Sequence, residues 1–453
     1  MAWFLTLLRS RFLLLIAFMM TVMGDPVSSV AYAIQAALGA LNGDLGLLFE
    51  TMGLVVAVIA VVVVNYLQIV ARFPEGGGAA AAAGRAFGEG WAFVPIGSLI
   101  VDYTLTISIS ISAGASAIVA YLPALAPLRT ALALGLLLLV VGVSWYGYSA
   151  RVAFGAMTTA FVAVSALVLL GSVGAHPTSA SAAHNTTSAH PAFMAILLAF
   201  PVAMALATGI EAPSSAIAQL GQLDDEGRKH FGRLTLLATL LIVGTLSLGF
   251  TAAAVRLGIG LPGSQDTTMI AEIGRASVGN LLFAAFQAIT SMLLLAAAAS
   301  SLQAGPGLLE ALARHKIETG ERFAILPVWL GRTNRYYTPY WGVALFGVLT
   351  AGITMLARAN EQEIVLFYAV AVFVSFLCGL LAMAVFSYRE GKRRSLALNT
   401  TGALIVFFVL VINVARGLPL ISLSASLMIA LCLYMLWVKS GRPRGVSKTV
   451  ARK

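Results

Sequence analysis

The fold of this chain is decided by the stretch Gly24-Asp25-Pro26-Val27-Ser28-Ser29-Val30-Ala31-Tyr32, which lies inside the apolar run Phe12–Leu38. That run is long enough to cross a bilayer. An aspartate at the centre of such a span costs roughly 2.5–3.5 kcal/mol on insertion scales, so we expect Asp25 to have a function. Pro26 lacks an N–H and clashes with the preceding turn, which predicts a helix break near Asp25. A break leaves backbone carbonyl oxygens free beside Asp25 at mid-membrane depth, and this combination predicts a cation site.

The composition predicts a membrane protein with many spans. Of the 453 residues, 60% are hydrophobic and only 10% are charged, and the mean hydropathy is +0.94. A net charge of +10 would suggest nucleic-acid binding in a soluble protein. In a membrane protein it fits cytoplasmic loops rich in Lys and Arg, so we expect no nucleic-acid partner. The two cysteines, Cys378 and Cys432, both lie in apolar runs and predict neither a disulfide framework nor a metal site.

Hydropathy predicts twelve membrane spans, with membrane lipid as the partner of their outer faces. The expected spans are Phe12–Leu38, Leu45–Val70, Trp91–Tyr121, Ala131–Trp145, Ala153–Val173, Phe193–Leu220, Leu234–Val255, Val278–Leu302, Trp341–Leu356, Ile364–Phe386, Leu398–Val414 and Leu418–Trp437. With the N-terminus inside, all but five of the 28 Lys and Arg residues fall on the cytoplasmic side. The sequence therefore predicts a multi-pass protein of a bacterial-type inner (cell) membrane with both termini in the cytoplasm.

Three acidic residues lie deep within the predicted spans, namely Asp25, Asp102 and Glu211, and no Lys or Arg lies equally deep. Intramembrane acids of this kind mark ion or proton pathways. In the third span Asp102, Thr106 and Ser110 follow one another at intervals of four, which places their oxygen atoms on one helical face. The structural alternative is that the acids are protonated and satisfied, and that the hydroxyl residues serve helix packing. The aspartate on the same stripe favours ion coordination.

The sequence around Glu211 repeats the pattern around Asp25. Each acid is followed by a proline and then by a Ser-Ser pair that begins three residues after the acid. Two interrupted spans, five apart, indicate an inverted repeat. The sequence therefore predicts an all-α integral membrane fold with twelve transmembrane helices, a LeuT-like 5+5 inverted repeat and broken helices 1 and 6. We place a first five-helix repeat at residues 1–175, a second at 193–388, two accessory helices at 398–438 and a short basic cytoplasmic tail at 439–453.

Five motifs spread over the first ten spans carry a family resemblance. They are Ser28-Ser29-Val30-Ala31-Tyr32 after Asp25, Gly76-Gly77-Gly78 after Pro74, Val101-Asp102-Tyr103 with Ile111-Ser112-Ala113-Gly114, Thr208-Gly209-Ile210-Glu211, and Tyr368-Ala369-Val370-Ala371-Val372-Phe373. With their spacing, they resemble the KimA-type potassium–proton symporters of the KUP family, a branch of the amino acid–polyamine–organocation superfamily.

The resemblance implies transport of potassium and protons without a cofactor. It implies that Glu211 couples the proton and that potassium is bound by Asp25, Tyr32, Thr106, Ser110 and Thr208, beside Asp102 and Tyr103 and with Tyr368 at the edge of the site. Similar proteins often carry a C-terminal cytosolic domain that dimerises and binds a regulatory cyclic dinucleotide. Here residues 439–453 alone follow the last span. We therefore expect no nucleotide regulation and no large cytosolic dimerisation domain, which leaves a homodimer open.

Three classes of function fit these observations to different degrees. A permease for amino acids or cationic amines shares the expected fold, but Asp25 would repel a carboxylate by about 4 kcal/mol at close range with an effective dielectric of 20. A channel or a non-transporting receptor is disfavoured by the two-repeat architecture. The triple glycine after Pro74 lacks the Gly-Lys-Ser/Thr ending of a phosphate loop and predicts a flexible gate connection. The sequence thus predicts a secondary active transporter, and not an enzyme, that imports potassium with protons by alternating access.

Overall fold

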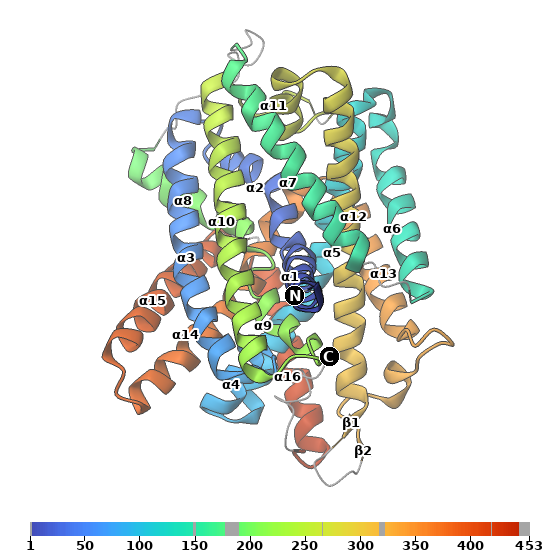
Figure 1. Ribbon diagram of the computed structural model, residues 1–453, viewed down its shortest axis with the longest axis vertical. Coiled ribbons are helices and arrows are strands. Elements are labelled where there is room, and N and C mark those ends of the chain that lie inside the picture. The colour runs from blue at the N-terminus through green and yellow to red at the C-terminus, as the bar shows by residue number, and fades with distance from the viewer. Residues whose placement is uncertain are drawn as a thin grey trace.

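A computed structural model describes residues 2–147, 151–176, 190–264, 266–316, 322–417 and 419–443. The described chain is dominated by long helices, many of which run along the vertical axis of Figure 1. Helix α11 (Met269–Ser277) lies at one end of this bundle. Helix α4 (Gly78–Phe87) and a short antiparallel hairpin of β1 (His315–Lys316) and β2 (Arg322–Phe323) lie at the other.

The remaining α-helices are α1 (Ala2–Val22), α2 (Gly24–Ala40), α3 (Leu48–Arg72), α5 (Phe93–Tyr121), α6 (Arg129–Trp145), α7 (Arg151–Gly174), α8 (Ala192–Ala203), α9 (Ala212–Ala216), α10 (Asp225–Leu257), α12 (Asn280–Ala313), α13 (Tyr340–Leu356), α14 (Glu361–Arg389), α15 (Arg393–Ala415) and α16 (Leu420–Lys439). Short 3-10 helices are η1 (Leu45–Leu47), η2 (Glu89–Ala92), η3 (Pro123–Leu128), η5 (Met204–Ala207), η6 (Ile217–Gln219) and η7 (Val328–Gly331).

Eleven helical segments of the described chain are long and apolar enough to cross a membrane. The chain is therefore a multi-pass membrane protein. The ninth predicted span corresponds to α13, an apolar helix of 17 residues that is shorter than the other eleven. The count of twelve spans, the 5+5 repeat and the proposed division into repeats, accessory helices and tail stay predictions. Residues 444–453 of the predicted tail lie outside the described chain.

The first helix break lies near Asp25, as the sequence predicts, and is centred on Met23. Helix α1 ends at Val22 and α2 begins at Gly24, with Met23 between them. Pro26 has no N–H to offer the carbonyl of Val22, so the helical hydrogen bonding is interrupted there. The Met23 N–H still bonds the Met19 carbonyl, and the Val27 N–H bonds the Met23 carbonyl, both at 2.9 Å. A proline is tolerated in the first turn of a new helix because the N–H groups there have no helical partner anyway. Asp25 therefore stands in the first turn of α2 instead of among the last carbonyls of α1.

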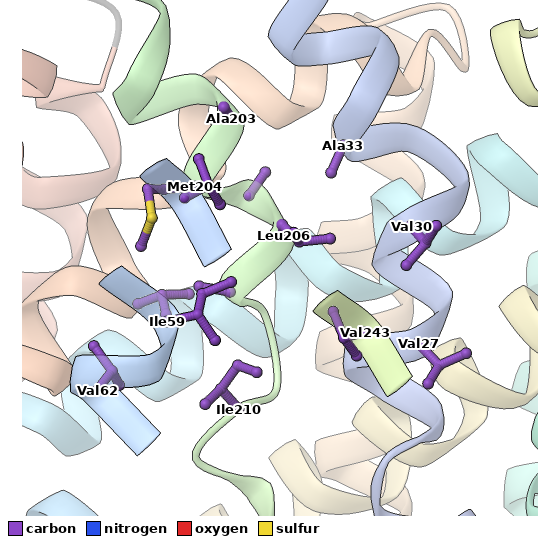
Figure 2. Close-up of a cluster of buried hydrophobic side chains, with 14 of the residues drawn as sticks. Val27, Val30, Ala33, Ile59, Val62, Ala203, Met204, Leu206, Ile210 and Val243 are labelled. Carbon is purple, nitrogen blue, oxygen red and sulfur yellow. The ribbon is translucent and has the colours of Figure 1, made fainter. Parts of the chain in front are cut away.

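The second break is wider and matches the prediction for the sixth span. After η5 the backbone is extended at Thr208 and left-handed at Gly209, with φ of +72°. Only glycine adopts that conformation without steric cost. Helix α9 then begins at Ala212, directly after Glu211. Figure 2 shows this unwound segment passing between α2 on one side and α3 on the other.

Buried apolar side chains hold the two breaks in place. The cluster drawn in Figure 2 joins Val27 and Val30 of α2 to Leu206 of η5 and Ile210 of the unwound segment, and all four are fully buried. Lipid is as apolar as these side chains, so their contribution is close packing rather than escape from water. This packing fixes irregular backbone at a depth where it is tolerated only if protein or a water-filled cavity surrounds it.

The triple glycine leads into a helix that the hydropathy pattern did not predict. Gly76, Gly77 and Gly78 all have positive φ, at +91°, +96° and +50°, and form the turn that starts α4. A side chain at Gly78 would meet the hydroxyl oxygens of Ser214 and Ser215 at 2.9 and 3.0 Å. The expected flexible connection is thus a defined turn that packs directly on the second broken helix.

Candidate ion-binding site

A cavity of about 630 Å³ enters the protein beside both helix breaks. Its walls include Asp25 of α2 and Glu211 of the unwound segment. It is also lined by the loop residues Gly77, Gly147 and Tyr336. All three loops belong to the side that the sequence assigns to the cytoplasm. The cavity therefore opens on the predicted cytoplasmic side.

The structure separates the nine predicted site residues into two groups. Four of them line the cavity: Asp25, Asp102, Tyr103 and Glu211. The other five do not line the cavity and are only 0–2% exposed, and they are Tyr32, Thr106, Ser110, Thr208 and Tyr368. The acids are thus open to the cavity, and most of the hydroxyl groups lie deeper.

Two hydrogen-bonded pairs connect the hydroxyl residues across helices. The Tyr368 hydroxyl of α14 is hydrogen-bonded to the Asp102 side chain of α5. It also accepts a hydrogen bond from Thr106 Oγ1 at 3.1 Å. On the other side, Tyr32 of α2 is hydrogen-bonded to Thr208, whose own Oγ1 donates to the Ala205 carbonyl at 2.7 Å. Tyr368 therefore joins one acid and one threonine of the predicted site.

Several buried oxygen atoms of the site have no hydrogen-bond partner. They are Asp25 Oδ1, Asp102 Oδ1, Glu211 Oε2 and Ser110 Oγ. Leaving such atoms unpaired in a protein interior is unfavourable by about 1–3 kcal/mol each, and by more for charged groups. The three carboxyl groups also repel one another, and no Lys, Arg or His is among the described residues that line the cavity. The arrangement suits a bound cation or proton. Either one would give the unpaired oxygen atoms a partner and reduce the repulsion between the carboxyl groups.

The two breaks touch each other at the site. A side chain at Gly209 would come within 2.9 Å of Pro26 Cδ and 3.0 Å of Asp25 Oδ2. Ser29 Oγ donates to the Leu206 carbonyl at 3.1 Å, which ties α2 to the unwound segment. Because Gly209 has no side chain, the backbone of one broken helix can lie directly on the acid of the other.

The sequence similarity between the breaks is reproduced in their local bonding. Ser28 Oγ donates to the Asp25 carbonyl at 2.7 Å, and Ser214 Oγ donates to the Glu211 carbonyl at 2.7 Å. In both cases the first serine of the pair bonds the backbone of the acid three residues earlier. The three carboxyl groups nevertheless stay apart, since no three His, Cys, Asp or Glu side chains of the described chain converge closely enough to hold a metal ion together.

Comparison with known proteins agrees with this architecture. A family model described as amino acid permease matches residues 12–438. The chain belongs to the amino acid permease family. This permease is also similar to the potassium transporter KimA of Bacillus subtilis (strain 168), with 29% identity over 403 residues. The alignment covers 85% of this permease and 64% of the length of that protein. That relative is described as a transporter, and permeases are a class of membrane transporter, so this chain is a member of a transporter family.

A buried ion pair lies on the side of the permease opposite the open cavity. Arg129 Nη2 at the start of α6 lies 2.5 Å from Glu361 Oε2 at the start of α14, and both side chains are less than 10% exposed. Ser116 Oγ of α5 bonds the same carboxylate at 2.8 Å. This group joins three helices where the cavity does not reach. The sequence analysis missed it, because Arg129 and Glu361 each stand at the end of a span and only the packing brings them together.

Proposed function

We propose that this permease imports potassium together with protons by alternating access. The observation that carries the proposal is the set of three acids, Asp25, Asp102 and Glu211, which line one cavity without a basic residue among its described lining. Unpaired acids at membrane depth are rare, and they mark pathways for cations or protons. The similarity to a potassium transporter supports potassium as the cation.

Hydroxyl and carbonyl oxygen atoms would form the potassium site. Potassium is large and gives up its hydration shell readily to protein oxygen dipoles. Tyr32, Thr106, Ser110 and Thr208 supply hydroxyl oxygens, each of which has two lone pairs and can accept while its proton is donated elsewhere. The carbonyl of Val22, which Pro26 leaves without a helical donor, would add a further oxygen at the cavity, which Val22 also lines. Tyr103 would form part of the wall between this site and the open cavity.

Glu211 would carry the coupled proton. Three acids that repel one another cannot all ionise easily without a cation, and the one with least support takes the proton. Asp102 has the Tyr368 hydroxyl as a partner, and Asp25 stands in the first turn of α2, where the helix dipole favours a carboxylate. Glu211 has a longer side chain and follows the unwound segment, so it can move between the site and the open half of the cavity. Asp102 is the next candidate for this role.

The proposed orientation places the permease in a cell membrane with both termini in the cytoplasm. The cavity then faces the cytoplasm, and the Arg129–Glu361 ion pair closes the outer side. In the transport cycle the broken helices would rock against α5 and α12 until the outer side opens and the inner side closes.

A second candidate function is permeation of an amino acid or a cationic amine. The volume of the cavity favours it, because about 630 Å³ falls within the range of small-molecule sites. The acids favour an amine over an amino acid, since Asp25 would repel a substrate carboxylate. This alternative makes a different prediction in the experiment that follows.

Growth of a potassium-uptake-deficient bacterium on limiting potassium tests the proposal. Expression of this permease should restore growth, and Asp25→Asn should abolish the rescue while membrane expression stays unchanged. If the wild-type chain does not restore growth and instead shows saturable uptake of a labelled amino acid or amine, the second candidate function replaces potassium import.

A further inference from the structure

A buried tyrosine next to the proton-carrying acid takes no part in the site described so far. Tyr66 of α3 is 0% exposed, and its ring packs edge-on against Phe376 with 5.9 Å between the ring centres. Figure 2 places Ile59 and Val62 of the same helix beside Ile210 of the unwound segment. Tyr66 is one helical turn beyond Val62 and lies on the same face of α3. Helix α3 packs against α9, which begins directly after Glu211.

The hydroxyl group of Tyr66 lies between two polar neighbours. It is beside the Ser375 side chain of α14 and within electrostatic reach of the Glu211 carboxyl group. Ser375 and Glu211 both line the open cavity. Yet the Tyr66 oxygen forms no well-aligned hydrogen bond, and neither does Glu211 Oε2. A phenol placed here for packing alone would leave its hydroxyl unpaired, which is unfavourable when phenylalanine would fill the same space.

We propose that Tyr66 is a positioning residue for the Glu211 carboxyl group, and that its O–H donates to Glu211 when the acid is deprotonated and to Ser375 when the acid is protonated. This rests on the proposed function of Glu211 as the proton carrier. The proton of Glu211 itself leaves to water in the cavity, and Tyr66 keeps its own. The role of Tyr66 is to stabilise the carboxylate that remains.

The other groups around Glu211 cannot take this role. Its acidic neighbours, Asp25 of α2 and Asp102 of α5, oppose its ionisation, and Tyr103 of α5 faces it across the cavity. Cys378 of α14 faces Tyr66 rather than Glu211. The charged residues on the neighbouring helices pair with one another near the cytoplasmic ends, as Arg85 with Glu75, Arg228 with Asp225 and Lys229 with Glu226. Arg11 of α1 is exposed.

The test measures potassium flux in proteoliposomes as a function of pH on the side that the cavity faces. Tyr66→Phe retains the ring and removes one donor from the carboxylate, so a higher pH is needed to release the proton. The curve of potassium flux against pH should therefore move by about one pH unit in the alkaline direction. Ser375→Ala removes the competing partner and should move the profile in the acid direction. In the double variant the serine change should have no further effect. Tyr121→Phe, which retains its ring contact with Phe283 on the far side, is the control and should match wild type.

The outcomes distinguish a failure of the proposed function from a failure of the proposed role of Tyr66. A wild-type protein without proton-driven flux would overturn the proposed function itself. If wild type is coupled and the Tyr66→Phe profile superimposes on it, the role of Tyr66 is wrong. Loss of potassium binding in Tyr66→Phe would also overturn it, because that result indicates a structural role. Opposite shifts in the two single variants, with binding retained, would support the inference.

Discussion

At the scale of single residues, hydroxyl groups connect the acids to the rest of the site. Tyr368 bonds both Asp102 and Thr106, and Tyr32 bonds Thr208. The sequence predicted that these residues belong together, because their types and spacing could be compared with a family pattern. It could not predict which hydroxyl meets which acid, since the partners lie on helices far apart in the chain. It also did not single out Tyr66, whose hydroxyl is significant only because Glu211 lies beside it.

Tyr368→Phe tests how much the hydroxyl that joins Asp102 and Thr106 contributes to potassium binding. We expect potassium to bind about tenfold more weakly, because hydrogen bonds to charged groups are worth about 1.5–3 kcal/mol and the ring itself is retained. Binding to the purified protein is measured by isothermal titration. Tyr434→Phe, which keeps its ring contact with Trp437 at 5.7 Å and lies far from the cavity, is the control. Equal affinity in the two variants would remove Tyr368 from the site.

At the scale of elements, the two breaks account for both the successes and the errors of the sequence prediction. The sixth-span break was predicted correctly, because Gly209 and Pro213 both interrupt a helix. The first break was predicted near its observed place, because Pro26 cannot bond the carbonyl four residues before it and is tolerated in the helical turn that follows. What was wrong is the expected position of Asp25 among the last carbonyls of the incoming helix, since it stands in the first turn of α2. Helices α4 and α11 were missed, since hydropathy detects what crosses lipid. For the same reason α10 and α12 extend beyond the predicted spans, to Asp225 and Ala313.

A matched pair of glycines tests whether the breaks must touch. Gly209 and Gly258 have nearly equal φ, +72° and +68°, so an alanine is strained at both positions by roughly 1–2 kcal/mol. At Gly209 the added methyl group would also press on Asp25 and Pro26, whereas at Gly258 nothing lies within 4 Å. We expect Gly209→Ala to lower potassium transport by tenfold or more and Gly258→Ala to leave it nearly unchanged, with rates normalised to membrane expression. Equal loss in both would mean that backbone strain, and not contact between the breaks, limits transport.

Two ion pairs test whether the buried Arg129–Glu361 pair on the outer side contributes more to stability than an exposed pair does. Glu361→Gln removes the carboxylate that neutralises the buried Arg129 guanidinium, which is expected to destabilise the protein by about 3–5 kcal/mol. Glu75→Gln removes the partner of Arg85 from a pair whose side chains are about 40% exposed, and pairs of that kind contribute about 0–1 kcal/mol. Thermal unfolding in detergent should therefore separate the two variants clearly. Similar melting temperatures would indicate that the Arg129–Glu361 pair contributes little.

At the scale of the whole molecule, the protein is open on one side and closed on the other. This asymmetry could not be predicted from the sequence, because it depends on how the broken helices sit against α5 and α12. Two serines of α12 differ in their access to the cavity and can therefore be used to measure this asymmetry. Ser300 lines the cavity, while Ser291 is 4% exposed and lies about two and a half helical turns closer to the opposite side.

Cysteine labelling measures this difference. In a background without the free thiols Cys378 and Cys432, Ser300→Cys should react with a membrane-impermeant maleimide in inside-out vesicles. Ser291→Cys should stay unreactive there. Labelling of Ser300→Cys only in right-side-out vesicles would reverse the proposed orientation, and equal labelling of both positions would contradict a closed outer half.

The central claim is that this permease moves potassium with a proton carried by Glu211. Its most direct test is potassium flux into proteoliposomes with and without an imposed proton gradient, in wild type and in Glu211→Gln, which mimics the protonated form. We predict that wild type accumulates potassium against its gradient when protons flow inward, and that Glu211→Gln binds potassium but loses this response. A wild-type protein that moves no potassium under the proton gradient would contradict the claim. If the Glu211→Gln protein still accumulates potassium, Glu211 is not the proton carrier, and Asp102 becomes the candidate for that role.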